Sequence, residues 1–217
     1  SSPARRRLTR IETRLEWAVI RPALIKVESK LSALSRSRFV WRFITIAAVI
    51  GLLIYGYVLA SRASYAVGGS DSSGYAQMAR SILKGEFVRP VKGPDLLGLP
   101  NDFDQIFRPL AFDPGPRPGT MVPMYPIGFP MLMALGALIA GWEYGPFLVT
   151  PIVGLLSLIL IYLVGLELGL PRGFSIAGAI MLAASPTFIH YSTQPMSEAV
   201  AMFWSLAAIL AALRSRK

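Results

Sequence analysis

The sequence predicts an all-α polytopic membrane protein with four transmembrane helices, one re-entrant or juxtamembrane helix and amphipathic helices at the N-terminus. Hydrophobic residues make up 53% of the 217 residues, and the mean hydropathy is positive. Several uncharged apolar runs approach or exceed the roughly 20 residues that cross a bilayer core. These observations place the chain among integral membrane proteins.

Residues 1–42 form a basic segment in which arginines and lysines alternate with apolar residues at three- and four-residue steps. This spacing predicts two amphipathic helices lying on the membrane surface, broken near Pro22. A disordered basic tail is the alternative. The basic region is far longer than the head of a secretory signal, so we expect it to stay in the cytoplasm.

The first span is predicted at residues 43–60, oriented by the positive charge that precedes it. The later apolar runs are residues 127–140, 144–166, 174–189 and 199–213. If all five apolar runs crossed the bilayer, the basic sites at Pro171-Arg172 and Arg214–Lys217 would lie outside, against the positive-inside rule. The 14-residue run 127–140 is short and begins among prolines, so we expect it not to cross.

This topology predicts an inner-membrane protein with cytoplasmic termini, a first outer loop over about residues 61–143, and a short outer turn over residues 190–198. The module from residue 43 to residue 217 would follow the N-terminal segment. Between residues 90 and 123 the sequence is rich in proline and glycine, with little helical or strand periodicity. Its acids are predicted to be solvated: Asp95, Asp102, Asp104 and Asp113.

A short amphipathic helix is predicted just beyond the first span, where Asp71 stands at its start and Gly85 can end it. Its apolar face carries Tyr75, Met78, Ala79 and Ile82. Its polar face carries Gln77, Arg80, Ser81 and Lys84. An aspartate at this position can cap the helix for about 1 kcal/mol. Because Asp71 would also lie at the outer membrane face, it is a candidate for chemistry there.

The composition limits cofactors and partners. The chain has no cysteine and a single histidine, His190, which excludes thiolate sites and a histidine-based metal site. A divalent metal held by carboxylates is possible but not required. The net charge of +10 is concentrated before the first span and at the end, which favours anionic lipids over nucleic acid as a partner.

Three motifs in order resemble those of the GT-C fold glycosyltransferases, the superfamily that includes lipid A aminoarabinose transferases and protein O-mannosyltransferases. They are Asp71 with Tyr75; Tyr125-Pro126-Ile127-Gly128-Phe129-Pro130; and the stretch from Pro171-Arg172-Gly173 through Ser185-Pro186 to Gln194-Pro195-Met196-Ser197-Glu198. The resemblance covers about residues 43–217. The chain is similar to the N-terminal part of that module, and we expect it to be incomplete.

The resemblance implies transfer of a sugar from a polyprenyl-phosphate carrier to an acceptor at the outer membrane face, with inversion at the anomeric carbon, and it assigns the catalytic base to Asp71. Candidate partners of the lipid phosphate are Arg80, Lys84, Arg89 and Lys92; further substrate-binding candidates are Tyr75, Tyr125, Gln194 and Glu198. Several of these have a structural alternative. Glu198 can favour the dipole of the last helix, Tyr125 can shape the loop, and His190 can be an interfacial residue.

The sequence also departs from the family, because Met124-Tyr125 stands where those two groups carry an acid-lysine pair or a histidine. The sugar and the acceptor are therefore not predicted.

A non-catalytic subunit that scaffolds other membrane subunits is the alternative function; a stop directly after Lys217 would favour it, and further spans would favour the enzyme. A transporter is a weaker third option, since the spans hold almost no ionisable residues.

Overall fold

A computed structural model describes residues 38–98 and 104–215. The predicted N-terminal amphipathic helices and Asp102 lie outside these residues. The chain forms two units, Ser1–Leu53 and Ile54–Lys217, which meet within one helix, α2 (Arg38–Ser61). The first unit is described only over residues 38–53, the first part of α2.

Helix α2 confirms the first predicted apolar helix, and its residues Arg42–Ser61 are long and apolar enough to cross a membrane. Its second half packs within the second unit. The Tyr55 hydroxyl donates to the Ala183 carbonyl at 2.7 Å, and Gly56 leaves room for the Leu155 side chain. The N–H of Ser64, just beyond α2, donates to the Thr193 carbonyl at 2.8 Å. These contacts fix the position of the chain where it leaves α2.

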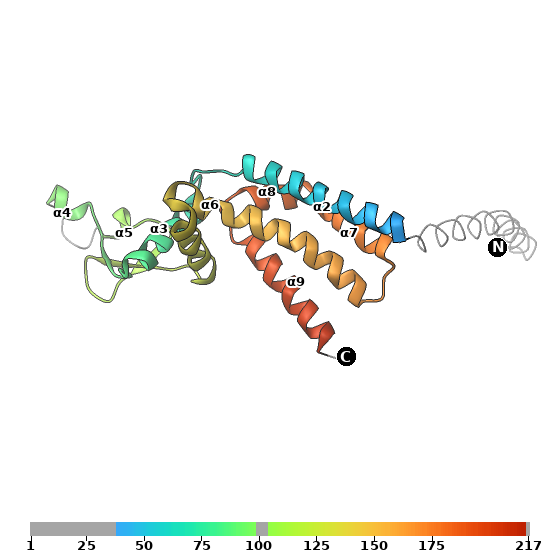
Figure 1. Ribbon diagram of the computed structural model, residues 1–217. Helices are drawn as coiled ribbons and strands as arrows, with labels where there is room; N and C mark the ends of the chain where they lie inside the picture. Colours follow the sequence, from blue (N-terminus) through green and yellow to red (C-terminus); the bar gives the residue numbers. More distant parts are fainter. Residues whose placement is uncertain (1–37, 99–103, 216–217) are drawn as a thin grey trace, which may run out of the picture. The chain divides into compact units, whose positions relative to one another are not determined.

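Helix α6 (Gly128–Glu167) is two helices in one, because Gly141 interrupts it with φ 76° and ψ 164°. Only glycine adopts this backbone conformation readily. We call residues 128–140 the short segment and residues 142–167 the long segment; Figure 1 shows the ribbon changing direction between them. The two segments touch at Gly136 and Gly145, where an added Cβ would overlap the opposing backbone. The predicted short helix at residues 127–140 is thus a separate helical segment.

The run predicted at residues 174–189 is not one straight helix. It forms α7 (Arg172–Ala183) and α8 (Pro186–Thr193), bent by 64° relative to each other. Helix α7 ends at Ala183, and Ser185 caps α8, with Pro186 at the first helical position. Because α8 continues to Thr193, the outer turn predicted at residues 190–198 is reduced to residues 194–197, before α9 (Glu198–Arg214).

Among the residues described, two helices, α2 and α6, are long and apolar enough to cross a membrane, and the bent pair α7 and α8 would make a third. Helix α9, with 17 residues, is shorter than these. The protein is therefore a mostly helical membrane protein with two or three such elements.

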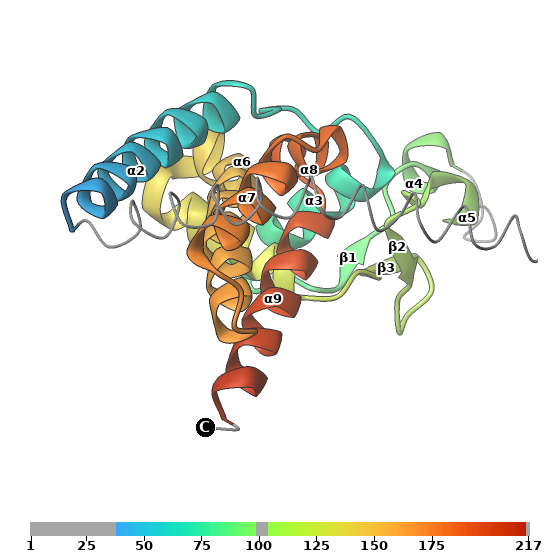
Figure 2. The same cartoon turned by 90° about the vertical axis from the view of Figure 1, so that its right-hand side faces the viewer.

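The loop between α3 and α6, which the sequence predicts to be an outer loop, contains β-structure, and this corrects the all-α prediction. Short strands β1 (Arg89–Pro90), β2 (Phe112–Pro114) and β3 (Thr120–Pro123) pair antiparallel in the order β1-β3-β2. Figure 2 shows them grouped with the one-turn helices α4 (Pro94–Leu97) and α5 (Asp104–Phe107). Strands of two to four residues are too short to produce a readable alternation. Asp104, predicted to be solvated, instead accepts a 2.8 Å hydrogen bond from the Gly119 N–H.

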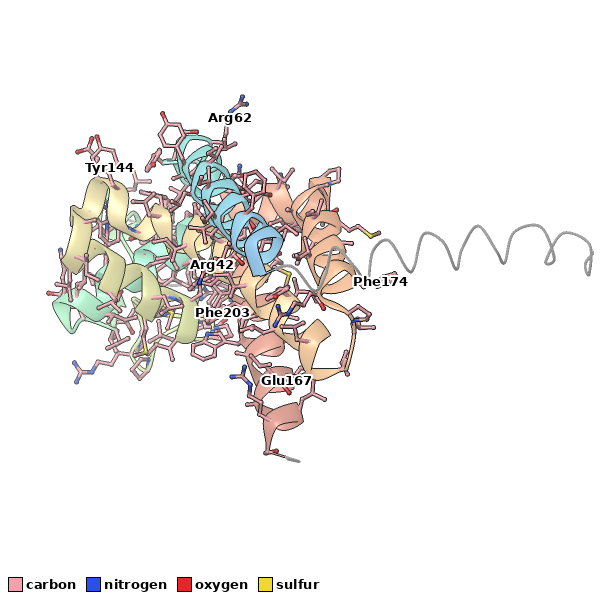
Figure 3. The ribbon with its side chains drawn as sticks, turned by 45° about the vertical axis from the view of Figure 1, so that its right-hand side comes forward. Arg42, Arg62, Tyr144, Glu167, Phe174 and Phe203 are labelled. Carbon is pink, nitrogen blue, oxygen red and sulfur yellow. The ribbon has the colours of Figure 1, made fainter. Side chains whose placement is uncertain are left out.

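The main apolar cluster lies where α3 (Ser70–Lys84), both segments of α6 and the start of α9 meet. Its buried members are Tyr75, Ala76, Ala79, Phe129, Met133, Ala134, Val149, Val153, Ala199 and Val200, and Phe203 packs against it. At the other ends of α6 and α9, Arg214 Nε donates to Glu167 Oε1 at 3.1 Å; Figure 3 shows where Glu167 and Phe203 lie. An ion pair with an exposed partner adds only about 0–1 kcal/mol, so the apolar cluster fixes the packing of these helices.

Candidate functional site

Helix α3 carries the candidate catalytic residue in its first turn. The helix begins at Ser70 with Gly69 before it, and the Ser72 hydroxyl accepts the Gly69 N–H at 3.1 Å. Asp71 therefore does not occupy the capping position that the sequence predicted. A first-turn carboxylate still interacts favourably with the helix dipole. The Asp71 side chain is exposed and does not cap the helix.

The two faces of α3 agree with the predicted pattern at all but one position. Tyr75, Met78 and Ala79 are buried, and Gly85, with φ 69°, ends the helix as predicted. Ser81, predicted on the polar face, is completely buried. Its hydroxyl donates to the Gln77 carbonyl one turn earlier, at 3.2 Å. A small hydroxyl residue that satisfies its own donor locally can occupy an apolar face.

The Asp71 carboxylate is held by a hydroxyl from a distant part of the chain. The Tyr125 O–H donates to Asp71 Oδ1, and the Ser70 O–H donates to the same oxygen at 3.3 Å. Among the described residues, both hydrogen bonds thus end on Oδ1, and Oδ2 is the oxygen that can accept from a further hydroxyl. The hydrogen bond to Asp71, then desolvation and the Asp71 charge, raise the pKa of Tyr125 to about 12.

Tyr125 packs against the side chain of Tyr75. The ring centroids of Tyr75 and Tyr125 are 4.5 Å apart, and Phe129 meets Tyr75 edge-on at 5.0 Å. The Tyr75 hydroxyl donates to the Ser197 hydroxyl at 3.0 Å, which connects α3 to the turn before α9. Tyr75 is 7% exposed, so most of its side chain is covered by its neighbours, Tyr125 and Phe129 among them.

Two of the predicted phosphate partners, Arg80 and Lys84, lie further along α3, whereas Arg89 is in β1 and Lys92 follows that strand. The Arg80 guanidinium stacks over the Trp142 ring at 4.6 Å, and Arg89 Nη1 donates to Gln77 Oε1 at 3.1 Å. Lys84 and Lys92 are exposed. Arg80 follows Asp71 by nine residues, which is about 13 Å of helix and half a turn around it. The structure therefore separates Asp71 from Arg80 and Lys84 along α3.

The remaining candidates surround the turn between α8 and α9. The Gln194 carbonyl accepts from the Met196 N–H at 2.8 Å. Glu198 is exposed in the first turn of α9, where the helix dipole favours it. It follows Ser197, the partner of Tyr75. His190 is exposed and meets the Tyr191 ring edge-on. Gln194 lies in this turn, between His190 in α8 and Glu198 in α9. Among the described residues, the hydrogen bonds of Asp71 come from Tyr125 and Ser70 and not from Gln194 or Glu198.

Two residues of the site escaped the sequence prediction, namely Ser197 and Gly74. A Cβ on Gly74 would overlap the Tyr125 ring and the Ala111 side chain. A glycine inside a predicted helix signals such a close approach, whereas nothing in the sequence pairs Tyr75 with Ser197, 122 residues away.

No group of three metal-ligating side chains occurs in the described ranges. Comparison of the chain with protein-family models, with curated proteins and with solved structures finds no match. The function must therefore be argued from the site.

Proposed function

We propose that the chain is part of an inverting membrane glycosyltransferase that moves a sugar from a polyprenyl-phosphate carrier to an acceptor hydroxyl, with Asp71 as the base. The observation that supports this most is the arrangement at the start of α3. An exposed carboxylate is fixed through Oδ1 by Tyr125, while Oδ2 can accept a proton. The order of the sequence motifs supplies the reaction class.

The reaction needs one base and one leaving group. Oδ2 of Asp71 takes the proton of the acceptor hydroxyl as that oxygen attacks the anomeric carbon of the sugar. The bond between this carbon and the phosphate oxygen breaks, and the polyprenyl phosphate leaves with the electron pair. Because attack and departure occur on opposite sides, the configuration inverts. No redox partner is needed, and a divalent metal would only assist departure of the phosphate.

The distance between the acidic and basic candidates refines the roles of the arginines. Reacting atoms must approach to about 3–3.5 Å, so a phosphate on the anomeric carbon stays close to Asp71. Arg80, about 13 Å along the helix, is better placed for a neighbouring lipid headgroup. Its stacking on Trp142 fits the membrane interface, where aromatic and basic side chains gather.

The packing of α3 supports the four-span topology in this proposal. Helix α3 contacts the chain at both ends of the short segment of α6, through Asp71 to Tyr125 and through Arg80 to Trp142. A helix with exposed Arg80 and Lys84 does not lie in hydrocarbon. The short segment, about 20 Å long, then lies with α3 at the level of the outer lipid headgroups. The spans are α2, the long segment of α6, α7 together with α8, and α9.

Labelling tests the topology and the orientation in the inner membrane. A tag inserted at Gly169, between α6 and α7, should be inaccessible from outside in intact cells. A tag inserted at Gly115, in the outer loop, should be accessible and serves as the control. A tag at Gly169 that is accessible from outside would mean that the short segment also crosses.

Asp71→Asn in the full-length protein tests the chemistry. Loss of the base should reduce sugar transfer by about 100- to 10,000-fold, measured with a radiolabelled lipid-linked sugar. Asp113→Asn, a change of the same kind at an exposed acid in β2, is the matched control and should leave transfer intact. Full turnover by Asp71→Asn would remove the catalytic assignment.

The second candidate function is a non-catalytic subunit of a membrane complex. It is favoured by the apolar side chains that α7 exposes, namely Phe174, Ile180 and Met181, which are 61–76% exposed; Figure 3 shows Phe174 projecting away from its helix. Such a surface suits lipid or another helix. Stoichiometric copurification with another membrane protein, together with unchanged transfer by Asp71→Asn, would favour this function.

A further inference from the structure

We infer that Tyr125 is a positioning residue that fixes the Asp71 carboxylate so that Oδ2 meets the acceptor, and that Gly74 provides the space in which Tyr125 sits. This inference rests on the proposed function for its catalytic meaning. The physical pairing on which it depends can be measured without any assay of sugar transfer.

An exposed aspartate in the first turn of a helix needs such a partner. Its side chain would otherwise exchange between rotamers and present either oxygen to the solvent. The bond from Tyr125 selects the rotamer in which Oδ1 faces the tyrosine, and the Ser70 hydroxyl reinforces it at 3.3 Å. Catalytic groups that are prealigned in this way avoid the entropy cost of alignment during the reaction.

Tyr125 can act as a fixed partner because its own position is determined on several sides. The Tyr75 ring packs against it at 4.5 Å. The missing side chain of Gly74 admits its ring edge. Its backbone is restricted by Pro126, and the N–H of Met124 donates to the Ala111 carbonyl at 3.2 Å. The phenol is therefore held by the fold and not by Asp71 alone.

The support continues into the apolar cluster. Tyr75 donates to Ser197 at the start of α9, and its ring belongs to the apolar cluster with Phe129 and Ala199. Two tyrosines thus connect the carboxylate to α6 and α9. Displacing either ring would move the carboxylate relative to the headgroup level without changing any group that touches the substrate.

The protonation state of Tyr125 agrees with a donor role. A phenol whose pKa is raised to about 12 stays protonated at neutral pH, so it donates to the carboxylate and does not compete with it for the acceptor proton. Tyr125 is therefore a positioning residue, and Asp71 remains the only base in this arrangement.

Tyr125→Phe in the full-length protein tests the catalytic meaning, because it removes the hydroxyl and keeps the ring. We expect kcat to fall by about 10- to 100-fold, while KM for the lipid-linked sugar changes less than about twofold. Tyr144→Phe, the same change at an exposed tyrosine in α6, is the matched control. Unchanged kcat in Tyr125→Phe, in an enzyme that transfers sugar, would overturn the inference and leave the proposed function in place.

The ionisation of Tyr125 tests the pairing directly. NMR of the protein labelled with ¹³Cζ-tyrosine, assigned by Tyr125→Phe, should show a titration near 12 in the wild type and a shift towards 10 in Asp71→Asn. An unshifted titration in Asp71→Asn would overturn the inference. A shifted titration in a protein that transfers no sugar would confirm the pairing and overturn the proposed function instead.

Discussion

The two ends of helix α3 hold their charged residues in different ways. At its N-terminal end, Asp71 is fixed by a hydroxyl, and the tyrosine that carries it packs against Tyr75 and the space at Gly74. Towards its C-terminal end, Arg80 lies over one ring and Lys84 extends from the surface. The first arrangement fixes a geometry and suits chemistry, whereas the second maintains a charge and suits headgroups of varied position.

Gly74→Ala should have the largest effect on stability, because it disrupts the N-terminal end directly. The new Cβ would overlap Tyr125 and Ala111, and overpacking of this kind costs about 1–3 kcal/mol. The measurement is thermal unfolding of the purified protein in detergent. Gly178→Ala in α7, where nothing lies within 4 Å of the added Cβ, is the control and should be neutral or stabilising. Equal melting temperatures for the two variants would contradict the close packing at Gly74.

Tyr75→Phe should destabilise the protein by about 1 kcal/mol, since it removes the hydrogen bond to Ser197. Ser197→Ala should cost a similar amount, and the double variant should be less destabilised than the sum of the two. Strict additivity in this double-mutant cycle, followed by thermal unfolding, would show that the two hydroxyls do not interact.

Arg80→Ala should cost about 0.5–1 kcal/mol through loss of the stacking on Trp142. Lys84→Ala, one turn further along the same exposed face, should change stability by less than about 0.5 kcal/mol. Trp142→Leu should remove the difference between these variants. If Arg80→Ala were as harmful as Gly74→Ala, the contrast between the two ends would be wrong.

The smallest expected effect is a pH dependence at the N-terminal end, because the Tyr125 pair is partly exposed. The pKa of Tyr125 is raised from 10.0 to about 12, so its stabilising contribution is complete below pH 10 and is lost as the pH rises through 12. The melting temperature advantage of the wild type over Tyr125→Phe should therefore shrink over this range. In the Asp71→Asn background this shrinkage should disappear.

The sequence predicted those features that depend on residues close together in the chain. The first apolar helix, the start of α3 within one residue and its end at Gly85 follow from local periodicity and from glycine chemistry. The break after residue 140 was also readable, because an apolar run stopped at a glycine. What these features share is a cause within a few turns of the residue concerned.

The features that escaped prediction are of two kinds, local hydroxyl contacts on α3 and contacts between residues far apart in the chain. Helical spacing places Ser81 on the polar face, yet its side chain is buried and its hydroxyl donates to the Gln77 carbonyl. The sequence predicts Asp71 as the capping residue of α3, whereas the Ser72 hydroxyl accepts the hydrogen bond from the Gly69 N–H. The contacts from Tyr125 to Asp71 and from Tyr75 to Ser197 join residues 54 and 122 positions apart, a separation over which periodicity carries no information.

Photolabelling tests the central claim that lipid-linked sugar binds at the N-terminal end of α3. A polyprenyl-phosphate sugar with a diazirine on the sugar would be irradiated with the full-length protein, and the adduct located by mass spectrometry. The account predicts adducts within residues 68–75 or 124–129, abolished by excess unlabelled donor. Competable adducts found only near Arg80 and Trp142, or in the spans, would contradict it.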